Sequence, residues 1–214
     1  ILLQTQINPE NILALTFTDS GVSTMRRRLV EIIGTAGYRV EIATFHSFCN
    51  EIIRRNPEDF TDLISSESMT EVEQIQIIES IIKSATVELL KPFGDPLYHL
   101  KNVLSAINDL KKEGVATDSL AKAIEEQKKD FAKIDDLVHD KGAYKGQMKG
   151  KYQDLDKDIR KSEELLILYK EYQQQLKEKR QYDFNDMLLQ VINALEKNSS
   201  LLLRLQEKYQ YILV

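Results

Sequence analysis

Two short segments place hydroxyl, aromatic and ionisable side chains between an apolar run and a helix-like pattern. The first is residues 16–19 (Thr-Phe-Thr-Asp), and the second is residues 44–47 (Thr-Phe-His-Ser). In open α/β sheets, ligands bind outside the carboxyl ends of the strands, where hydroxyl groups reach phosphate oxygens and an exposed Phe stacks on a base. The N-terminus of a following helix also favours a phosphate. Both segments are therefore candidates for binding a phosphate-bearing ligand.

Each segment also has a purely structural interpretation, which the residues alone leave open. In the first, a capped turn would join strand to helix with Phe17 in the core. In the second, His46 would be a hydrogen-bonded structural histidine. Cys49 follows on an apolar helix face, which indicates an inert buried thiol, and no catalytic Cys–His pair is expected.

A third segment, residues 182–187 (Tyr-Asp-Phe-Asn-Asp-Met), carries two carboxylates three residues apart. Such a pair suggests acid–base or metal chemistry. The alternative is that Asp183 caps a helix and that Asp186 is a first-turn acid favoured by the helix dipole.

A lysine-rich stretch, residues 141–152 (KGAYKGQMKGKY), has four lysines and no acid, and we name it the lysine loop. Its glycines predict a mobile connection in which Lys141, Lys145, Lys149 and Lys151 can follow a phosphate backbone. The alternative is a solvated linker. The stretch is not a phosphate-binding P-loop, because only three residues separate Gly146 from Gly150 and a Tyr follows the lysine. No other glycine of the chain fits that motif better.

Composition limits the remaining possibilities. The 214 residues carry a net charge of −5, so any nucleic-acid surface must be local. One cysteine and three histidines without metal-ligand spacing predict neither a disulfide nor a metal site. No apolar run approaches the roughly 20 residues that span a bilayer, and no secretory signal is visible. A cytoplasmic location is expected.

The pattern of apolar runs and helix-like stretches around these segments predicts an α/β fold that is predominantly helical. Apolar runs at residues 11–18 and 40–45 read as strands buried on both faces, each followed by a helix, and Asp19 or Ser20 would cap the first helix. This order implies a parallel sheet. Residues 60–181 show no convincing strand, and residues 211–214 read as a third strand.

Within the helical region, four helices are expected. Thr70 and Glu73 form a capping box that opens the first of them. The second begins at Asp95-Pro96, the third is capped by Thr117, and the fourth runs from about 154 to 179. The first helix is expected to bury one stripe of side chains, made up of Val72, Ile75, Ile78, Ile82 and Ala85.

Taken together, the segments resemble the superfamily 1 DNA helicases of the UvrD/Rep/PcrA family. Residues 8–29 (NPENILALTFTDSGVSTMRRRL) look like motif Ia of that family, and residues 43–49 (ATFHSFC) look like motif Ib. Residues 182–188 resemble the segment ahead of motif II. Residues 209–214 (YQYILV) look like the strand that leads into it.

The resemblance implies a partial RecA-like sheet of about three strands with an inserted all-helical subdomain. Residues 1–58 and 182–214 would belong to domain 1A, and residues 59–181 would form subdomain 1B. The implied parent is a bacterial ATP-dependent DNA helicase that uses ATP and Mg²⁺ and acts on single-stranded DNA and on its junctions with duplex DNA. DNA contacts would come from Thr16, Phe17, Thr18, Asp19, Thr44, His46, Ser47 and the four lysines of the lysine loop.

The resemblance also implies what the 214 residues lack. The chain opens without Met and closes on a strand, which indicates a fragment. The phosphate loop and the motif II acids would lie outside it, as would the remaining helicase domains, so we expect no catalytic, cofactor-binding or metal-binding residue in this chain.

The sequence departs from the family pattern at two places, and two alternative interpretations of its function remain. Asp19 stands where the family usually has Asn, and residues 20–22 (Ser-Gly-Val) replace Lys/Arg-Ala-Ala, which weakens phosphate contact there. The parent could instead be the motor of an AddA/RecB-type helicase–nuclease. The chain could also be a non-enzymatic helical interaction module.

Overall fold

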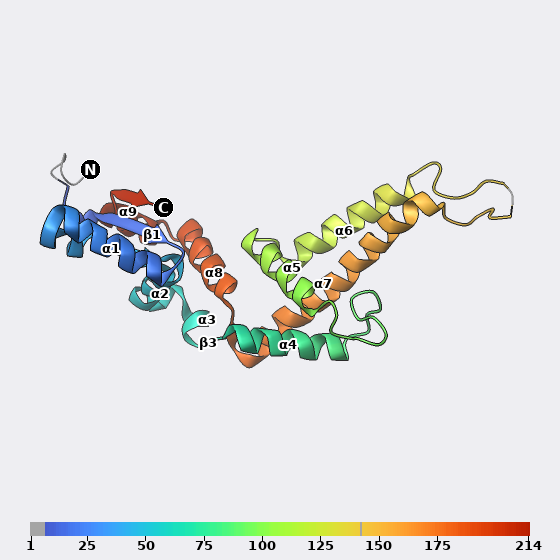
Figure 1. The fold of residues 1–214 in the computed structure, drawn as a ribbon, viewed down its shortest axis with the longest axis horizontal. Helices are drawn as coiled ribbons and strands as arrows, with labels where there is room; N and C mark the ends of the chain where they lie inside the picture. Colours follow the sequence, from blue (N-terminus) through green and yellow to red (C-terminus); the bar gives the residue numbers. More distant parts are fainter. Residues whose placement is uncertain (1–6, 142) are drawn as a thin grey trace. The chain divides into compact units, whose positions relative to one another are not determined.

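A computed structural model describes residues 7–141 and 143–214 (Figure 1). The chain divides into two compact units, which we describe separately. Unit 1 takes the residues up to Glu67 and those from Asp186 onward, and unit 2 takes residues 68–185. Each unit has a hydrophobic core of its own.

Unit 1 is built on a three-stranded parallel sheet with the order β2-β1-β5. The strands are β1 (Ile12–Thr16), β2 (Glu41–Thr44) and β5 (Tyr211–Leu213). Four consecutive residues of β1 are buried, because helices cover both faces of a parallel sheet. This confirms the expected α/β fold with a small parallel sheet.

Helices lie on both faces of this sheet. They are α1 (Asp19–Ile33), α2 (Phe45–Arg55) and α9 (Ser199–Lys208). The one-turn helix α3 (Thr61–Ile64) follows α2, and α8 (Phe184–Lys197) precedes α9. Val22 and Leu29 of α1 pack on one face, against Ile12, Ala14, Val40 and Ile42. The other face packs against α2 and α9 through Phe45, Phe48 and Leu205.

Short 3-10 turns complete unit 1: η1 (Pro9–Asn11), η2 (Gly34–Arg39) and η3 (Pro57–Asp59). Gly34 ends α1 with φ 68°, a left-handed value that suits a residue without a Cβ.

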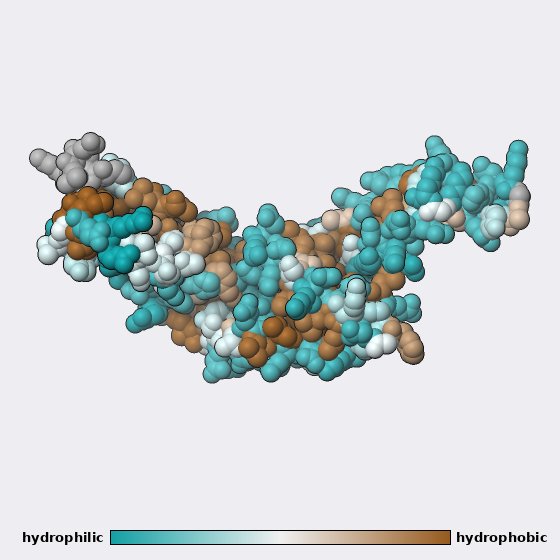
Figure 2. All heavy atoms as spheres, viewed as in Figure 1, coloured by the Kyte–Doolittle hydropathy of each residue, from teal (hydrophilic) through white to brown (hydrophobic). Residues whose placement is uncertain are grey.

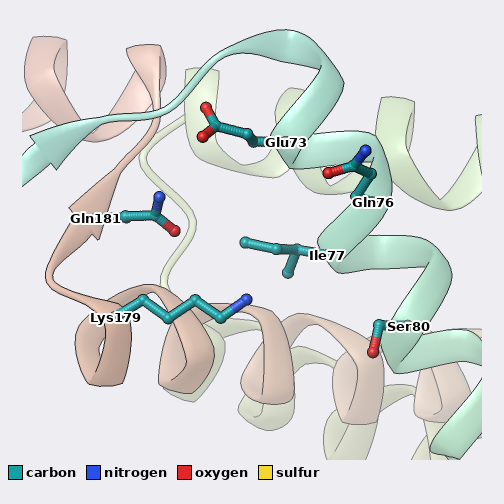
Figure 3. A pocket seen from close by; sticks show the side chains of 6 residues that line it. All are labelled: Glu73, Gln76, Ile77, Ser80, Lys179 and Gln181. Atoms are coloured by element: carbon teal, nitrogen blue, oxygen red, sulfur yellow. The ribbon is translucent and has the colours of Figure 1, made fainter.

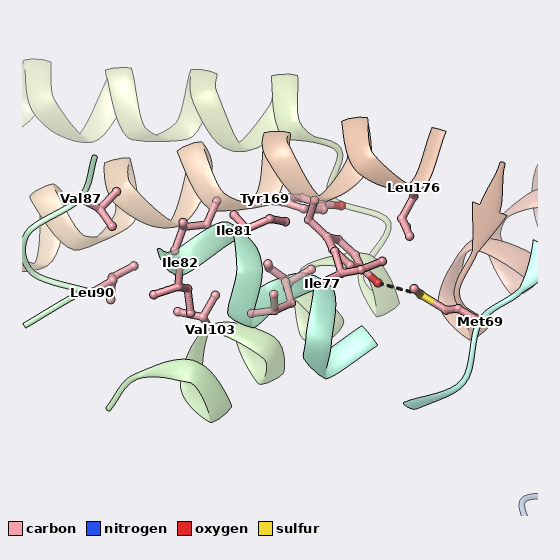
Figure 4. Packing of buried hydrophobic residues seen from close by; sticks show 13 residues of the cluster. Met69, Ile77, Ile81, Ile82, Val87, Leu90, Val103, Tyr169 and Leu176 are labelled. Atoms are coloured by element: carbon pink, nitrogen blue, oxygen red, sulfur yellow. Dashed lines mark hydrogen bonds between the residues drawn. The ribbon is translucent and has the colours of Figure 1, made fainter. Parts of the chain in front are cut away.

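Unit 2 is helical. Its elements are α4 (Glu71–Ser84), α5 (Leu100–Lys112), α6 (Thr117–Ala132), the 3-10 turn η4 (Gly150–Tyr152) and the long α7 (Gln153–Lys179). Figure 4 shows the cluster in which α4, α5 and α7 pack together, with Ile81, Val103 and Tyr169 among its labelled members. The capping box at Thr70 and Glu73 is confirmed.

Unit 2 also has a short two-stranded sheet, which the sequence did not predict. Strands β3 (Glu67–Ser68) and β4 (Gln181–Tyr182) pair with each other where the chain enters and leaves this unit. Two-residue strands are too short to show the alternating pattern that reveals a strand in a sequence.

The predicted buried stripe of α4 is wrong in part. Val72 is 63% exposed and Ile75 is also exposed, whereas Gln74, Ile77 and Ile81 face inward together with Ile78 and Ile82. A polar residue occupies the buried face because Gln74 finds hydrogen-bond partners there.

Two predicted helix starts are also wrong. Helix α5 begins at Leu100, and Asp95 instead accepts a hydrogen bond from the Leu97 N–H in a turn. Thr117 is the first residue of α6 rather than its cap. Among the described residues, no helix is long and apolar enough to cross a membrane.

Candidate nucleic-acid interface

The pairing register of the sheet brings the first two candidate segments together. Thr16 of β1 lies opposite Thr44 of β2, so Phe17 and Phe45 come directly after the ends of two neighbouring strands, at the same edge of the sheet. Their ring centroids are 5.4 Å apart, with planes inclined at 46°. Phe17 is 83% exposed, so its placement in the core, the structural alternative, is wrong. We call Phe17, Asp19, Phe45 and His46 the strand-end surface.

Hydroxyl groups in these segments cap the helices. The Thr18 side chain accepts a hydrogen bond from the Gly21 N–H at 3.0 Å, so Thr18, and neither Asp19 nor Ser20, caps α1. The predicted cap of α1 was therefore wrong by one residue, because Thr, Asp and Ser are all favoured at the N-cap position. Gly21 leaves room here, since a Cβ would approach the Thr16 Oγ1 atom to 2.5 Å and the Thr16 side chain would have to shift.

Thr44 and Ser47 form a capping box at the start of α2. The Ser47 N–H donates to the Thr44 Oγ1 at 3.1 Å, and the Thr44 N–H donates to the Ser47 Oγ at 2.9 Å. Thr44 is buried and Ser47 is exposed. These two side chains therefore fix the direction of α2, with the N-terminus of the helix at the strand ends.

His46 and Asp19 are the exposed ionisable groups of the strand-end surface. Partial desolvation lowers the pKa of His46 below its usual 6.5, and the Asp19 carboxylate opposes that shift. The imidazole is mostly neutral at pH 7 and gains its charge on acidification. Cys49 is buried, and burial raises the pKa of its thiol to about 11, in keeping with the inert thiol expected.

The lysine loop lies at the end of unit 2 where α6 and α7 meet; Figure 2 shows this end largely covered by hydrophilic residues. Gly142 lies outside the described residues. No helix runs through 143–149; the backbone turns back, with the His139 N–H donating to the Gln147 carbonyl at 2.9 Å and Gly146 at φ 80°.

The four lysines of this loop are not equivalent. Lys151 and Lys149 bind the Asp136 carboxylate at 2.6 and 3.5 Å, and the Tyr152 hydroxyl also donates to it. These bonds, led by that of Lys151, lower the pKa of Asp136 to about 2. Lys141 and Lys145 are exposed.

The acidic pair of the third segment separates into different environments. Asp183 is buried, directly precedes α8, and accepts hydrogen bonds from the Lys111 ammonium at 2.5 Å and from the Tyr172 hydroxyl at 2.8 Å. Among residues 7–141 and 143–214, no group of three or more His, Cys, Asp or Glu side chains could hold a metal ion.

Lys111 is a residue that the sequence analysis missed. A signal was present, because Lys111 follows the buried Ile107 by four residues and therefore lies on the buried face of α5. A lysine at such a position needs a buried partner, but the sequence does not tell which of the many acids it is.

A polar hollow of about 450 Å³ lies in unit 2 between α4 and the end of α7 (Figure 3). It is lined by Glu73, Gln76, Ile77, Ser80, Lys179 and Gln181. None of the residues predicted to contact a ligand lines it.

Comparison with known proteins identifies relatives for the whole chain. The model of the UvrD/REP helicase N-terminal domain matches residues 1–214. The chain is 25% identical over 216 residues to an ATP-dependent DNA helicase PcrA of Staphylococcus aureus and 24% identical to one of Staphylococcus epidermidis. Each alignment covers 99% of this chain but only 24% of the relative. The chain thus spans about a quarter of the length of the curated relatives it matches.

Proposed function

The chain belongs to the UvrD/REP helicase N-terminal domain family, and from this premise we propose that it supplies part of the single-stranded DNA path of an ATP-dependent DNA helicase. One observation carries the proposal: an exposed aromatic ring, Phe17, lies beside Phe45 and next to the N-termini of α1 and α2. Stacking platforms beside phosphate-binding positions are what single-strand binding requires.

Each part of the strand-end surface has a distinct task in this proposal. Phe17 stacks on a base, and Phe45 supports its ring from the protein side. The side chains of Thr18, Thr44 and Ser47 hold the two helix starts in place, so that their N–H groups and dipoles face a phosphate. His46 adds a group that can donate a hydrogen bond. Asp19 opposes phosphate binding and limits affinity at this point.

We assign unit 1 to domain 1A and unit 2 to subdomain 1B of the family. The division into units falls after residues 67 and 185, and the boundaries of 58 and 181 for the family's domains stay a prediction. Lys141 and Lys145 are the first candidates for phosphate contact in unit 2, because Lys149 and Lys151 must first leave Asp136.

We propose no contact with ATP or Mg²⁺ for the residues of this chain. Its sequence has no Gly-x-x-x-x-Gly-Lys-Ser/Thr loop, and the described residues offer no cluster of acids for a metal. In the proposed parent, nucleotide chemistry belongs to other segments, and no hydrolytic step is assigned to residues 1–214. The cytoplasmic location stays a prediction from composition.

The stacking role is tested by Phe17→Ala in the full-length protein. We expect single-stranded DNA affinity to fall by about 1–3 kcal/mol, the usual value of one base–aromatic stack. The readout is fluorescence anisotropy with a labelled oligothymidylate, alongside thermal unfolding. Because Phe17 is exposed, the melting temperature should hardly change.

Phe93→Ala is the matched control, since Phe93 is also an exposed aromatic residue but belongs to unit 2. We expect it to leave the affinity unchanged. If Phe17→Ala binds DNA as tightly as the parent protein, the strand-end surface is not part of the DNA path.

A further inference from the structure

One arginine of α1 binds along strand β2, at the edge of the sheet in unit 1. Among the described residues, β2 pairs with β1 alone, so its other side is a free edge. The Arg26 Nη1 atom donates to the Tyr38 and Val40 carbonyls at 3.3 and 3.2 Å. Its Nη2 atom donates to the Ile42 carbonyl at 3.4 Å. A single guanidinium therefore binds three carbonyls, each two residues from the next.

These carbonyls face the free edge rather than β1. In a strand, the carbonyls of residues two apart point to the same side, so those of Val40 and Ile42 share one direction. Paired strands lie only about 4.8 Å apart, which leaves no room for a guanidinium between β1 and β2. The carbonyls that Arg26 binds therefore belong to the outer side of β2.

The position of Arg26 on α1 explains why it reaches this edge. Helix α1 lies on one face of the sheet (Figure 1), where Val22 and Leu29 pack against Val40 and Ile42. Val22 precedes Arg26 by four residues and Leu29 follows it by three, so the three side chains leave the same face of the helix. Arg26 is accordingly only partly exposed. Packing of α1 thus places the guanidinium beside β2.

A free strand edge offers backbone N–H and C=O groups with which a strand of another chain can pair. A guanidinium is suited to cover such an edge, because it has five N–H donors in one plane, no acceptor, and a permanent charge. A strand that approached β2 would have to displace its hydrogen bonds and bury that charge. Strand β5, at the other edge of the described sheet, provides the contrast, since its three residues are all exposed.

We propose that Arg26 blocks the free edge of β2 against pairing with a second copy of this chain. The excluded partner is the β2 strand of that copy, because it carries the same edge and two such edges can pair about a two-fold axis. The proposal concerns unit 1 alone and does not depend on the DNA path.

The test removes the guanidinium from the full-length protein and measures association. Arg26→Met keeps an unbranched apolar side chain and a good helix former, so α1 and its packing are retained. Sedimentation velocity over a concentration series reports the oligomeric state, and hydrogen exchange of residues 38–44 reports pairing at β2. We expect dimers at concentrations about tenfold below those at which the parent protein associates, the shift expected from one or two recovered hydrogen bonds. Exchange in residues 38–44 should slow as the dimer forms.

Arg27→Met is the matched control, because Arg27 is the next residue of α1, is exposed, and is not among the donors to β2. It removes the same charge and should leave both measurements unchanged. An Arg26→Met protein with the parent's oligomeric state would overturn the proposal. Equal association of the two variants would also overturn it, as would association without slower exchange in residues 38–44.

Thermal unfolding shows whether Arg26→Met is folded. If it is not, Arg26→Lys replaces it in the same experiment, because a single ammonium keeps the charge but cannot span three carbonyls. This variant should still associate at lower concentration than the parent protein does. If it stays as monomeric as the parent protein, the hydrogen bonds of the guanidinium are not what blocks the edge, and the proposal is wrong.

Discussion

His46 is the residue of the strand-end surface whose charge changes near neutral pH. Desolvation lowers its pKa below the usual 6.5, so the imidazole is mainly neutral at pH 7 and takes up a proton only on acidification. A protonated imidazole attracts a phosphate. We therefore expect single-stranded DNA affinity to rise as the pH falls from 7.5 to 5.5, by about fivefold for a contact worth about 1 kcal/mol.

His46→Gln should remove this rise while leaving affinity at pH 7.5 nearly unchanged, as measured by anisotropy titrations at fixed ionic strength. His99→Gln is the control, because His99 belongs to unit 2. An unaltered pH profile in His46→Gln would show that the imidazole does not face the DNA.

At this scale, the sequence located the strand-end surface, because the residues that form it are close in sequence to strand ends. It could not identify which of three adjacent polar residues caps α1, since Thr18, Asp19 and Ser20 have similar capping preferences. It also could not pair Lys111 with Asp183. The two are 72 residues apart, and no local pattern connects them.

Among the elements, the lysine loop gives the sharpest prediction, because one acid holds two of its lysines. Asp136→Asn should release Lys149 and Lys151 for phosphate contact. We expect tighter DNA binding at low salt and a slope of log affinity against log salt that is steeper by about 1–2 units, since each added phosphate contact contributes about 0.7–0.9.

Asp130→Asn is the matched control, because it removes the same charge from an exposed acid that binds only Lys133 among the ion pairs described. It should change the slope much less. If both variants behave alike, the effect is one of net charge, and the lysine loop is a spacer.

The same contact also predicts a pH effect on the loop itself. The folded pKa of Asp136 is about 2, below the usual 3.8, so its ion pairs stabilise the loop fully above about pH 4. This stabilisation is lost as the pH falls towards 2, when the carboxylate takes up a proton.

Element boundaries followed from the sequence where local signals were strong. The capping box at Thr70 predicted the start of α4 correctly. The long run of apolar residues at helical spacing predicted both ends of α7 to within one residue. Prediction failed at α5, where Asp95-Pro96 forms a turn rather than a helix start. Strands β3 and β4 were missed, because their pairing joins residues far apart in the sequence and leaves no local pattern.

At the scale of the whole molecule, the edge strand β5 of the small sheet affects whether the chain stays monomeric. Strand β5 is an edge strand whose residues Tyr211, Ile212 and Leu213 are all exposed, and Figure 2 shows hydrophobic residues on the surface of unit 1 near β5 and α9. An exposed apolar edge strand is a template for association with another chain. Measurements on the 214 residues alone therefore need a confirmed monomer.

The last prediction concerns that isolated chain. As a verified monomer, it should bind single-stranded DNA in a salt-dependent manner and hydrolyse no ATP, with or without DNA. The physical reason is that the strand-end surface and the lysine loop lie within residues 7–152, whereas no phosphate loop exists anywhere in the sequence. Anisotropy across a salt series and a coupled ATPase assay provide the two measurements. DNA-stimulated ATPase that follows the monomer peak through gel filtration would contradict the assignment of nucleotide chemistry to other segments. Binding that is absent at low salt would contradict the DNA path.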